Sequence, residues 1–158
     1  MEIERKFLTD GFPYSLTGYK KLEITQGYIL FDPEVRVRKE NDKYFYTSKI
    51  GTGLVREEKE REIDEATYSF YIKDVKGIVK KTRYLIPLTN DLIAEYDVYQ
   101  DNLLGLKTVE VEFDTVEDAE NFIIPVWFGG EITGIKMYQN SNLSRLKKTL
   151  MKKQDCQK

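Results

Sequence analysis

The stretch that decides the fold is Glu2-Ile3-Glu4-Arg5-Lys6-Phe7, at the start of the chain. Residues two apart in a β-strand point to the same face and lie about 6–7 Å from each other. Glu2, Glu4 and Lys6 would therefore share one face of a strand, with Ile3 and Phe7 on the opposite face. The pattern predicts a strand that gathers two acids and a lysine on one side.

The same spacing of like charges recurs along the chain. It is found in Arg36 and Arg38, Lys81 and Arg83, Glu95 and Asp97, Glu110 and Glu112, and in the series Arg56, Glu58, Glu60 and Glu62, which Lys49 precedes. A half-exposed antiparallel sheet with apolar residues inside and polar residues outside would explain any single pair. Such a solvated face, however, favours mixed signs, because neighbouring like charges repel. The segregation of signs favours an inverted barrel, whose charged faces point inward.

Period-two patterns and turn residues separate about eight strands. We expect strands at 2–7, 26–31, 34–38, 44–50, 55–63, 82–86, 92–99 and 108–113, and helices at 65–75, 116–122 and 141–152. The predicted fold class is therefore mainly β (α+β), a closed eight-stranded antiparallel β-barrel with a few helices packed outside. We expect residues 1–158 to form one domain that ends in a basic helix end and tail, 147–158.

The composition excludes several classes of function. Among 158 residues there are 25 Lys and Arg, 27 Asp and Glu, one cysteine (Cys156) and no histidine. Cys/His zinc sites, histidine-dependent catalytic triads and haem ligation by histidine are therefore ruled out. The net charge of −2 argues against a nucleic-acid partner. No segment reads as a membrane span or secretion signal, so we expect a cytoplasmic protein.

A lumen with segregated charges suits a polyanion together with a divalent cation. Arg offers phosphate a bidentate fork, and carboxylates hold Mg²⁺ or Mn²⁺, which prefer hard oxygen ligands. Without compensating partners, so many buried charges would be very costly. The sequence therefore predicts a site for a small phosphorylated compound and a hard metal ion.

These residues resemble the CYTH superfamily, the triphosphate tunnel metalloenzymes. Glu2-Ile3-Glu4-Arg5-Lys6 is similar to the ExExK signature of that family. The remaining elements follow in family order: Gln26-Gly27-Tyr28, Val35-Arg36-Val37-Arg38, Thr47-Ser48-Lys49, Arg56-Glu57-Glu58-Lys59-Glu60, Lys81-Thr82-Arg83-Tyr84, Glu95-Tyr96-Asp97, Glu110-Val111-Glu112 and the closing Tyr138-Gln139-Asn140-Ser141-Asn142-Leu143. The resemblance covers residues 2 to about 146.

The resemblance implies a tunnel of eight antiparallel strands that cleaves a terminal phosphate with a divalent metal, Mg²⁺ or Mn²⁺. The residues it implies as metal ligands are Glu2, Glu4, Glu58, Glu60, Glu110 and Glu112. The triphosphate would be bound by Lys6, Arg36, Arg38, Lys49, Arg56, Lys81, Arg83 and Lys136. Glu4, Glu112 and Lys81 are the candidate catalytic residues. Phosphoryl transfer is mainly positioning and charge neutralisation, so no protein nucleophile is required.

One segment departs from the family pattern, because Ile135 and Met137 stand where charged residues are common. The first hypothesis for function is hydrolysis of inorganic tripolyphosphate to pyrophosphate and phosphate. Alternatives are a nucleoside or thiamine triphosphatase, a class IV-type adenylate cyclase, and a non-catalytic polyphosphate-binding module. A structural barrel with an outer charged surface also remains open, as does a homodimer.

Overall fold

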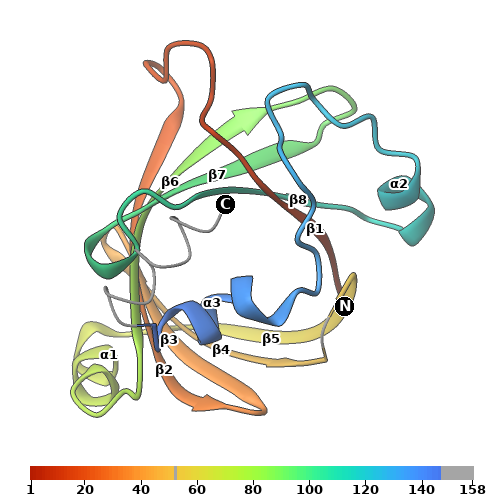
Figure 1. Cartoon of the computed structure of the whole chain (residues 1–158). Helices are drawn as coiled ribbons and strands as arrows, with labels where there is room; N and C mark the ends of the chain where they lie inside the picture. Colours follow the sequence, from red (N-terminus) through yellow and green to blue (C-terminus); the bar gives the residue numbers. More distant parts are fainter. Residues whose placement is uncertain (52, 147–158) are drawn as a thin grey trace.

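Eight antiparallel strands surround a central lumen in the computed structural model, which describes residues 1–51 and 53–146 (Figure 1). The strands are β1 (Glu2–Leu8), β2 (Lys20–Phe31), β3 (Glu34–Glu40), β4 (Lys43–Ile50), β5 (Val55–Ile63), β6 (Ile78–Pro87), β7 (Ile93–Tyr99) and β8 (Lys107–Glu112). They follow the order β1-β5-β4-β3-β2-β6-β7-β8, and β8 pairs with β1 to close the barrel. The predicted fold class is thereby confirmed.

The helices are short and lie at the barrel wall. They are α1 (Glu65–Ile72), α2 (Val116–Glu120) and α3 (Asn140–Leu143), with 3₁₀ turns η1 (Asp101–Leu103) and η2 (Lys136–Tyr138). The Asp64 carboxylate caps α1 by accepting from the Thr67 amide at 2.7 Å. In Figure 1, α1 lies outside the sheet beside β2 and β3, whereas α3 and η2 lie across one side of the lumen.

Two strands begin several residues earlier than the sequence pattern predicts. β2 begins at Lys20 and β6 at Ile78, where we expected residues 26 and 82. The added segments meet where Ile24 lies opposite Lys81 and Thr25 opposite Lys80. Charged residues near the start of β2 hide the alternation of polar and apolar residues. The strand conformation there depends on pairing with β6.

All three helices end earlier than predicted. After α1 the chain turns back to β2, where the Lys76 amide donates to the Tyr28 carbonyl and the Tyr28 amide donates to the Gly77 carbonyl. After α2, Phe122 packs against Phe113 instead of continuing the helix. The third helix ends at Leu143. The basic helix end and tail predicted for residues 147–158 lie outside the described residues.

The larger apolar cluster lies outside the charged lumen, between the barrel wall and the segments that cover it. Phe7, Val109 and Val111 are buried on that side, with the ring of Phe128 centred 5.1 Å from that of Phe7. A second cluster packs Tyr28 and Tyr99 against Leu143 of α3. These tyrosines lie opposite Arg36 and Lys81, so the second cluster is on the lumen side of the wall.

The seam between β1 and β5 is short and is completed by a later segment. Only Glu2–Arg56 and Ile3–Val55 are paired between these strands. Further along β1, the Ile132 amide donates to the Lys6 carbonyl at 2.8 Å, and the Lys6 amide donates to Thr133 Oγ1 at 2.9 Å. This places residues 131–140 against the lumen. Within the described residues, none of the helices has the length and apolar character needed to cross a membrane.

Candidate active site

Strand register turns the charged side chains into the lumen. Directly opposite residues of antiparallel strands point to the same face of the sheet. Glu4 lies opposite Glu112, and Lys6 lies opposite Glu110. The charged faces that the alternation predicts therefore meet across the interior.

The lumen contains a cavity of about 230 Å³. This is smaller than the roughly 300–1,000 Å³ typical of sites for drug-sized ligands, so the cavity suits a small molecule. Nine acidic and seven basic residues line it. The acids are Glu2, Glu4, Glu34, Glu40, Glu58, Glu60, Glu95, Glu110 and Glu112, and the bases are Lys6, Arg36, Arg38, Lys49, Arg56, Lys81 and Arg83.

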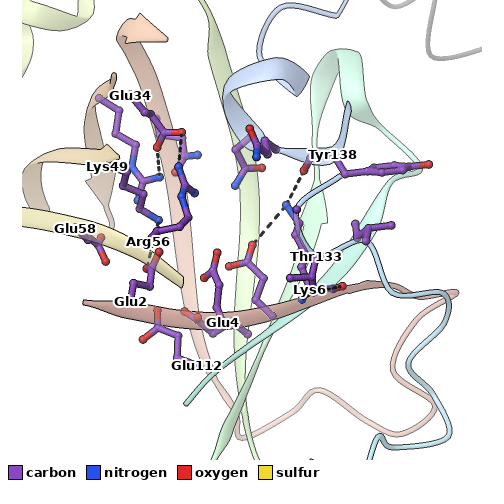
Figure 2. A pocket seen from close by; sticks show the side chains of 18 of the residues that line it. Glu2, Glu4, Lys6, Glu34, Lys49, Arg56, Glu58, Glu112, Thr133 and Tyr138 are labelled. Carbon is purple, nitrogen blue, oxygen red and sulfur yellow. Dashed lines mark hydrogen bonds and ion pairs between the residues drawn. The ribbon is translucent and has the colours of Figure 1, made fainter. Parts of the chain in front are cut away.

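All predicted site residues except Lys136 line this cavity. Lys136 lies in η2 with an exposed side chain, and its carbonyl accepts from the Asn142 side chain. Lys136 does not line the cavity, and the turn of η2 places Ile135 and Tyr138 there instead, so its contact with triphosphate stays a prediction. Lys6 Nζ reaches the same segment, donating to the Tyr138 carbonyl at 2.9 Å (Figure 2).

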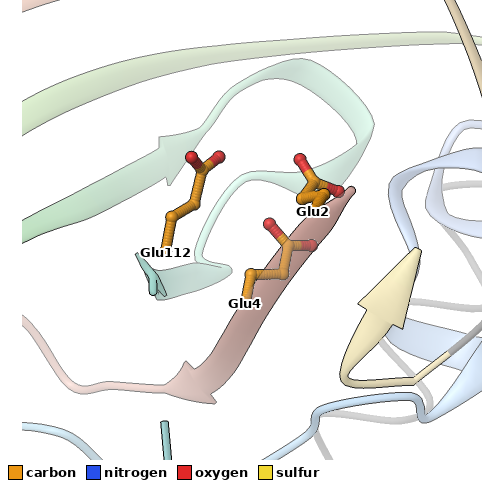
Figure 3. Close-up of side chains that lie close together, drawn as sticks. All are labelled: Glu2, Glu4 and Glu112. Atoms are coloured by element: carbon orange, nitrogen blue, oxygen red, sulfur yellow. The ribbon is translucent and has the colours of Figure 1, made fainter. Parts of the chain in front are cut away.

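Three carboxylates meet at one end of the cavity. Glu2 and Glu4 of β1 and Glu112 of β8 each offer a carboxylate oxygen, and these atoms lie within 4.8 Å of one another (Figure 3). Burial and the nearby Glu110 raise the pKa of Glu4 to about 8, and burial and Glu95 raise that of Glu112 to about 7. The arrangement favours a bound cation, because converging hard oxygen ligands are what Mg²⁺ and Mn²⁺ prefer.

The other predicted metal ligands lie in different surroundings. Burial raises the pKa of Glu2, and the neighbouring Glu58 raises it further, so Glu58 lies beside the trio. Glu60 instead accepts from Thr47 at 2.9 Å and pairs with Arg38 at 3.3 Å. Glu110 pairs with Lys6 at 3.6 Å, and although it is buried, the surrounding lysines and Arg83 lower its pKa. The structure thus separates the six acids into two groups.

A buried ion-pair network forms the wall of β6 and β7. The Asp97 carboxylate accepts from Arg83 at 2.7 and 2.9 Å and from Lys81 Nζ at 2.8 Å. Arg83 also donates to Glu95 at 2.6 Å. Burial lowers the pKa of Lys81 to about 8, although Asp97 opposes the shift. Asp97 is fully buried and does not line the cavity, so it holds two bases whose side chains do.

A second group of ion pairs lies on β3, β4 and β5. Glu34 pairs with Arg36 at 3.2 Å and with Arg56 at 3.4 Å (Figure 2). Lys49 Nζ donates to Glu2 at 3.1 Å and so joins this group to the acidic end. These basic side chains are neutralised by acids in the protein without ligand, and they can exchange those partners for phosphate oxygens.

Three residues that the sequence did not identify as site residues contribute to the cavity or to its walls: Gln26, Glu34 and Asp97. Glu34 lies two residues before Arg36, so the alternation that identified the arginine also places Glu34 in the lumen. Asp97 belongs to a charge pair that the sequence shows. Gln26 carries no charge, and only its register opposite Arg38 reveals its position.

The acidic end opens into a second cavity of about 540 Å³. Its acids are Glu2, Glu58, Asp91, Glu95, Glu112 and Asp114, and no lysine or arginine among residues 1–51 and 53–146 lines it. The acidic end of the lumen therefore favours cations over anions.

Comparisons with known proteins agree with this geometry. No family model matches the chain. It is 38% identical over 147 residues to an inorganic triphosphatase of Nitrosomonas europaea, a match that covers 90% of this chain and 96% of that protein. It is 37% identical over 147 residues to an inorganic triphosphatase of Acetivibrio thermocellus, covering 90% and 92%.

A solved structure shows the same arrangement of strands. The crystal structure of the inorganic triphosphatase NE1496 is 36% identical in sequence and aligns with a TM-score of 0.68 over 92% of this chain and 95% of that chain. Similarity at this level extends over the strands that carry the cavity-lining charges. The chain therefore belongs to the inorganic triphosphatase family.

Proposed function

We propose that this protein is a metal-dependent triphosphatase of the CYTH superfamily, which hydrolyses inorganic tripolyphosphate to pyrophosphate and phosphate inside its tunnel. The observation that carries the proposal is the meeting of the Glu2, Glu4 and Glu112 carboxylates in one cavity with seven basic side chains. A polyanion and a divalent cation together would satisfy both sets. The relatives named as inorganic triphosphatases support this choice of substrate.

Glu2, Glu4 and Glu112 would hold Mg²⁺ or Mn²⁺, with Glu58 beside them. A bound ion of this kind neutralises phosphoryl oxygens and lowers the pKa of a water molecule. The raised pKa values of Glu4 and Glu112 support the assignment, because a cation would replace the protons that these crowded carboxylates retain.

Lys6, Arg36, Arg38, Lys49, Arg56, Lys81 and Arg83 would bind the triphosphate. Each approaches the cavity while paired with an acid, so binding exchanges one negative partner for another. Glu60 and Glu110 would act in this part of the site by orienting Arg38 and Lys6. Holding the substrate in line and neutralising its charge supplies most of the catalysis that phosphoryl transfer requires.

The test is phosphate release from tripolyphosphate, ATP and thiamine triphosphate, each measured with Mg²⁺, with Mn²⁺ and with EDTA. We expect tripolyphosphate to be the best substrate, because the cavity is lined almost entirely by charged and polar side chains, which suit phosphate groups rather than a base or thiazole ring. Turnover should disappear in EDTA. If the protein binds these compounds with metal but hydrolyses none of them, it is a polyphosphate-binding module and not an enzyme.

A further inference from the structure

The wall that β2 and β3 contribute to the cavity carries buried polar atoms with no partner. Within the described residues these atoms include Gln26 Oε1, Arg36 Nε and Arg38 Nε. All three residues line the cavity, and Gln26 is 0% exposed. Burying an unpartnered polar atom costs free energy, so a group of them in one cavity indicates atoms that a ligand completes.

Strand register brings the three side chains together. Gln26 lies opposite Arg38, and Tyr28 lies opposite Arg36 on the same pair of strands. Opposite residues have Cβ atoms about 4.5–5.5 Å apart. The amide of Gln26 is fixed at one end, where its Nε2 lies 2.7 Å from the Tyr28 hydroxyl. Its other end remains available to the cavity.

The chemistry of these atoms indicates what completes them. Both arginine Nε groups are donors on positively charged side chains, so anionic oxygen is the acceptor that suits them best. A carboxamide can rotate by half a turn and exchange its oxygen and nitrogen, and a tyrosine hydroxyl can donate as well as accept. With Tyr28 donating to Gln26 Oε1, the Gln26 Nε2 group turns toward the cavity and becomes another donor.

We propose that Gln26 is a further substrate-binding residue, which donates from its side-chain amide to a phosphoryl oxygen held by Arg36 and Arg38. The proposal rests on the proposed function for the identity of the substrate. Gln26 is neutral, unlike Arg36 and Arg38, so its side-chain amide adds a hydrogen bond without changing the charge of the lumen. Tyr28 acts as a positioning residue that orients the amide.

The experiment compares Gln26→Leu and Gln26→Glu with the same two substitutions at Gln100. Gln100 is a matched control, because it donates to Thr82 Oγ1 at 2.9 Å and does not line the cavity. Losing a hydrogen bond to a charged group should raise KM for tripolyphosphate by about tenfold or more in Gln26→Leu, with a smaller change in kcat. Gln26→Glu should raise KM further, because a carboxylate would repel the substrate.

Thermal unfolding establishes whether each variant is folded, and Tyr28→Phe provides a milder test. Removing that hydroxyl should raise KM less than Gln26→Leu does, because the amide remains but is no longer oriented. Equal KM values in the Gln26, Tyr28 and Gln100 variants would overturn the inference. If the unmodified protein does not turn over tripolyphosphate, the proposed function fails instead. The stabilisation against unfolding that tripolyphosphate gives with Mg²⁺ then measures binding by the same variants.

Discussion

Glu4 lies two residues from Glu2 on β1 and directly opposite Glu112 on β8, in the acidic trio. Glu4→Gln keeps the size of the side chain and removes its charge, so we expect turnover of tripolyphosphate to fall roughly 100-fold or more. Thermal stability should stay equal or increase, because burial already disfavours this charge and Glu110 repels it. Phosphate release over a range of Mg²⁺ concentrations checks the prediction. Glu117→Gln, on exposed α2, is the control, and an active Glu4→Gln protein would contradict the metal assignment.

Asp97 compensates two buried cations at once. Asp97→Asn leaves Lys81 and Arg83 with less negative charge, and removing one partner of a buried ion pair typically costs about 3–5 kcal/mol. We expect a loss of that size in the free energy of unfolding, measured by urea denaturation. Asp101→Asn is the comparison, because Asp101 is exposed and lies 3.9 Å from the exposed Lys80. A loss no greater than that of Asp101→Asn would contradict the prediction.

Lys81 should give substrate binding a dependence on pH. Its ammonium group is charged below its pKa, which burial lowers to about 8, and it is surrounded by Asp97, Arg83, Glu110 and Lys6. As pH rises through about 8, the ammonium loses its proton and the tunnel loses one positive charge. KM for tripolyphosphate should therefore increase above this pH. In Lys81→Ala, KM should be higher throughout and this step should be absent, and a step that persists would assign it to another group.

At the scale of the elements, alternation predicts each strand centre but not each boundary. The ExExK stretch predicts β1 correctly because Glu2, Glu4 and Lys6 share one face while Ile3 and Phe7 lie on the other. Alternation does not reveal the first half of β2, because Lys20, Lys21 and Glu23 are charged and fall on both faces of the strand. Their strand conformation depends on pairing with β6, which is distant in sequence. Local patterns carry no information about such partners.

Gly27 fixes where α1 approaches the barrel. A Cβ atom at this position would lie 2.6 Å from Cδ1 of Ile72, the last residue of α1, and 2.7 Å from Cγ1 of Val75 in the segment that follows. Gly27→Ala should therefore destabilise the fold by about 1–3 kcal/mol through overpacking, measured by urea denaturation. Gly130→Ala is the control, because no atom lies within 4 Å of its added Cβ. Equal stability of the two variants would show that α1 can shift without cost.

At the scale of the whole molecule, acidic and basic side chains that are far apart in the sequence meet in one lumen. The chain has a formal net charge of −2, and the nine acids and seven bases that line the cavity differ by the same amount. The sequence predicts which residues face inward, because that depends only on alternation. It does not predict that Glu110 pairs with Lys6 rather than joining the acidic trio, because that depends on register between β1 and β8.

This balance predicts how ligands change the stability of the protein. A lumen with more acids than bases attracts a divalent cation before it attracts a polyanion, and the acidic second cavity strengthens that preference. We therefore expect Mg²⁺ alone to raise the melting temperature, because a ligand that binds only the folded protein stabilises it by about 2.7 kcal/mol at one hundred times its Kd. Tripolyphosphate should raise the melting temperature more with Mg²⁺ than in EDTA. Calorimetry of Glu4→Gln provides the control, since this variant should lose most of the response to Mg²⁺. Stabilisation by tripolyphosphate that is equal with and without metal would show that the basic side chains bind it independently of the acidic end.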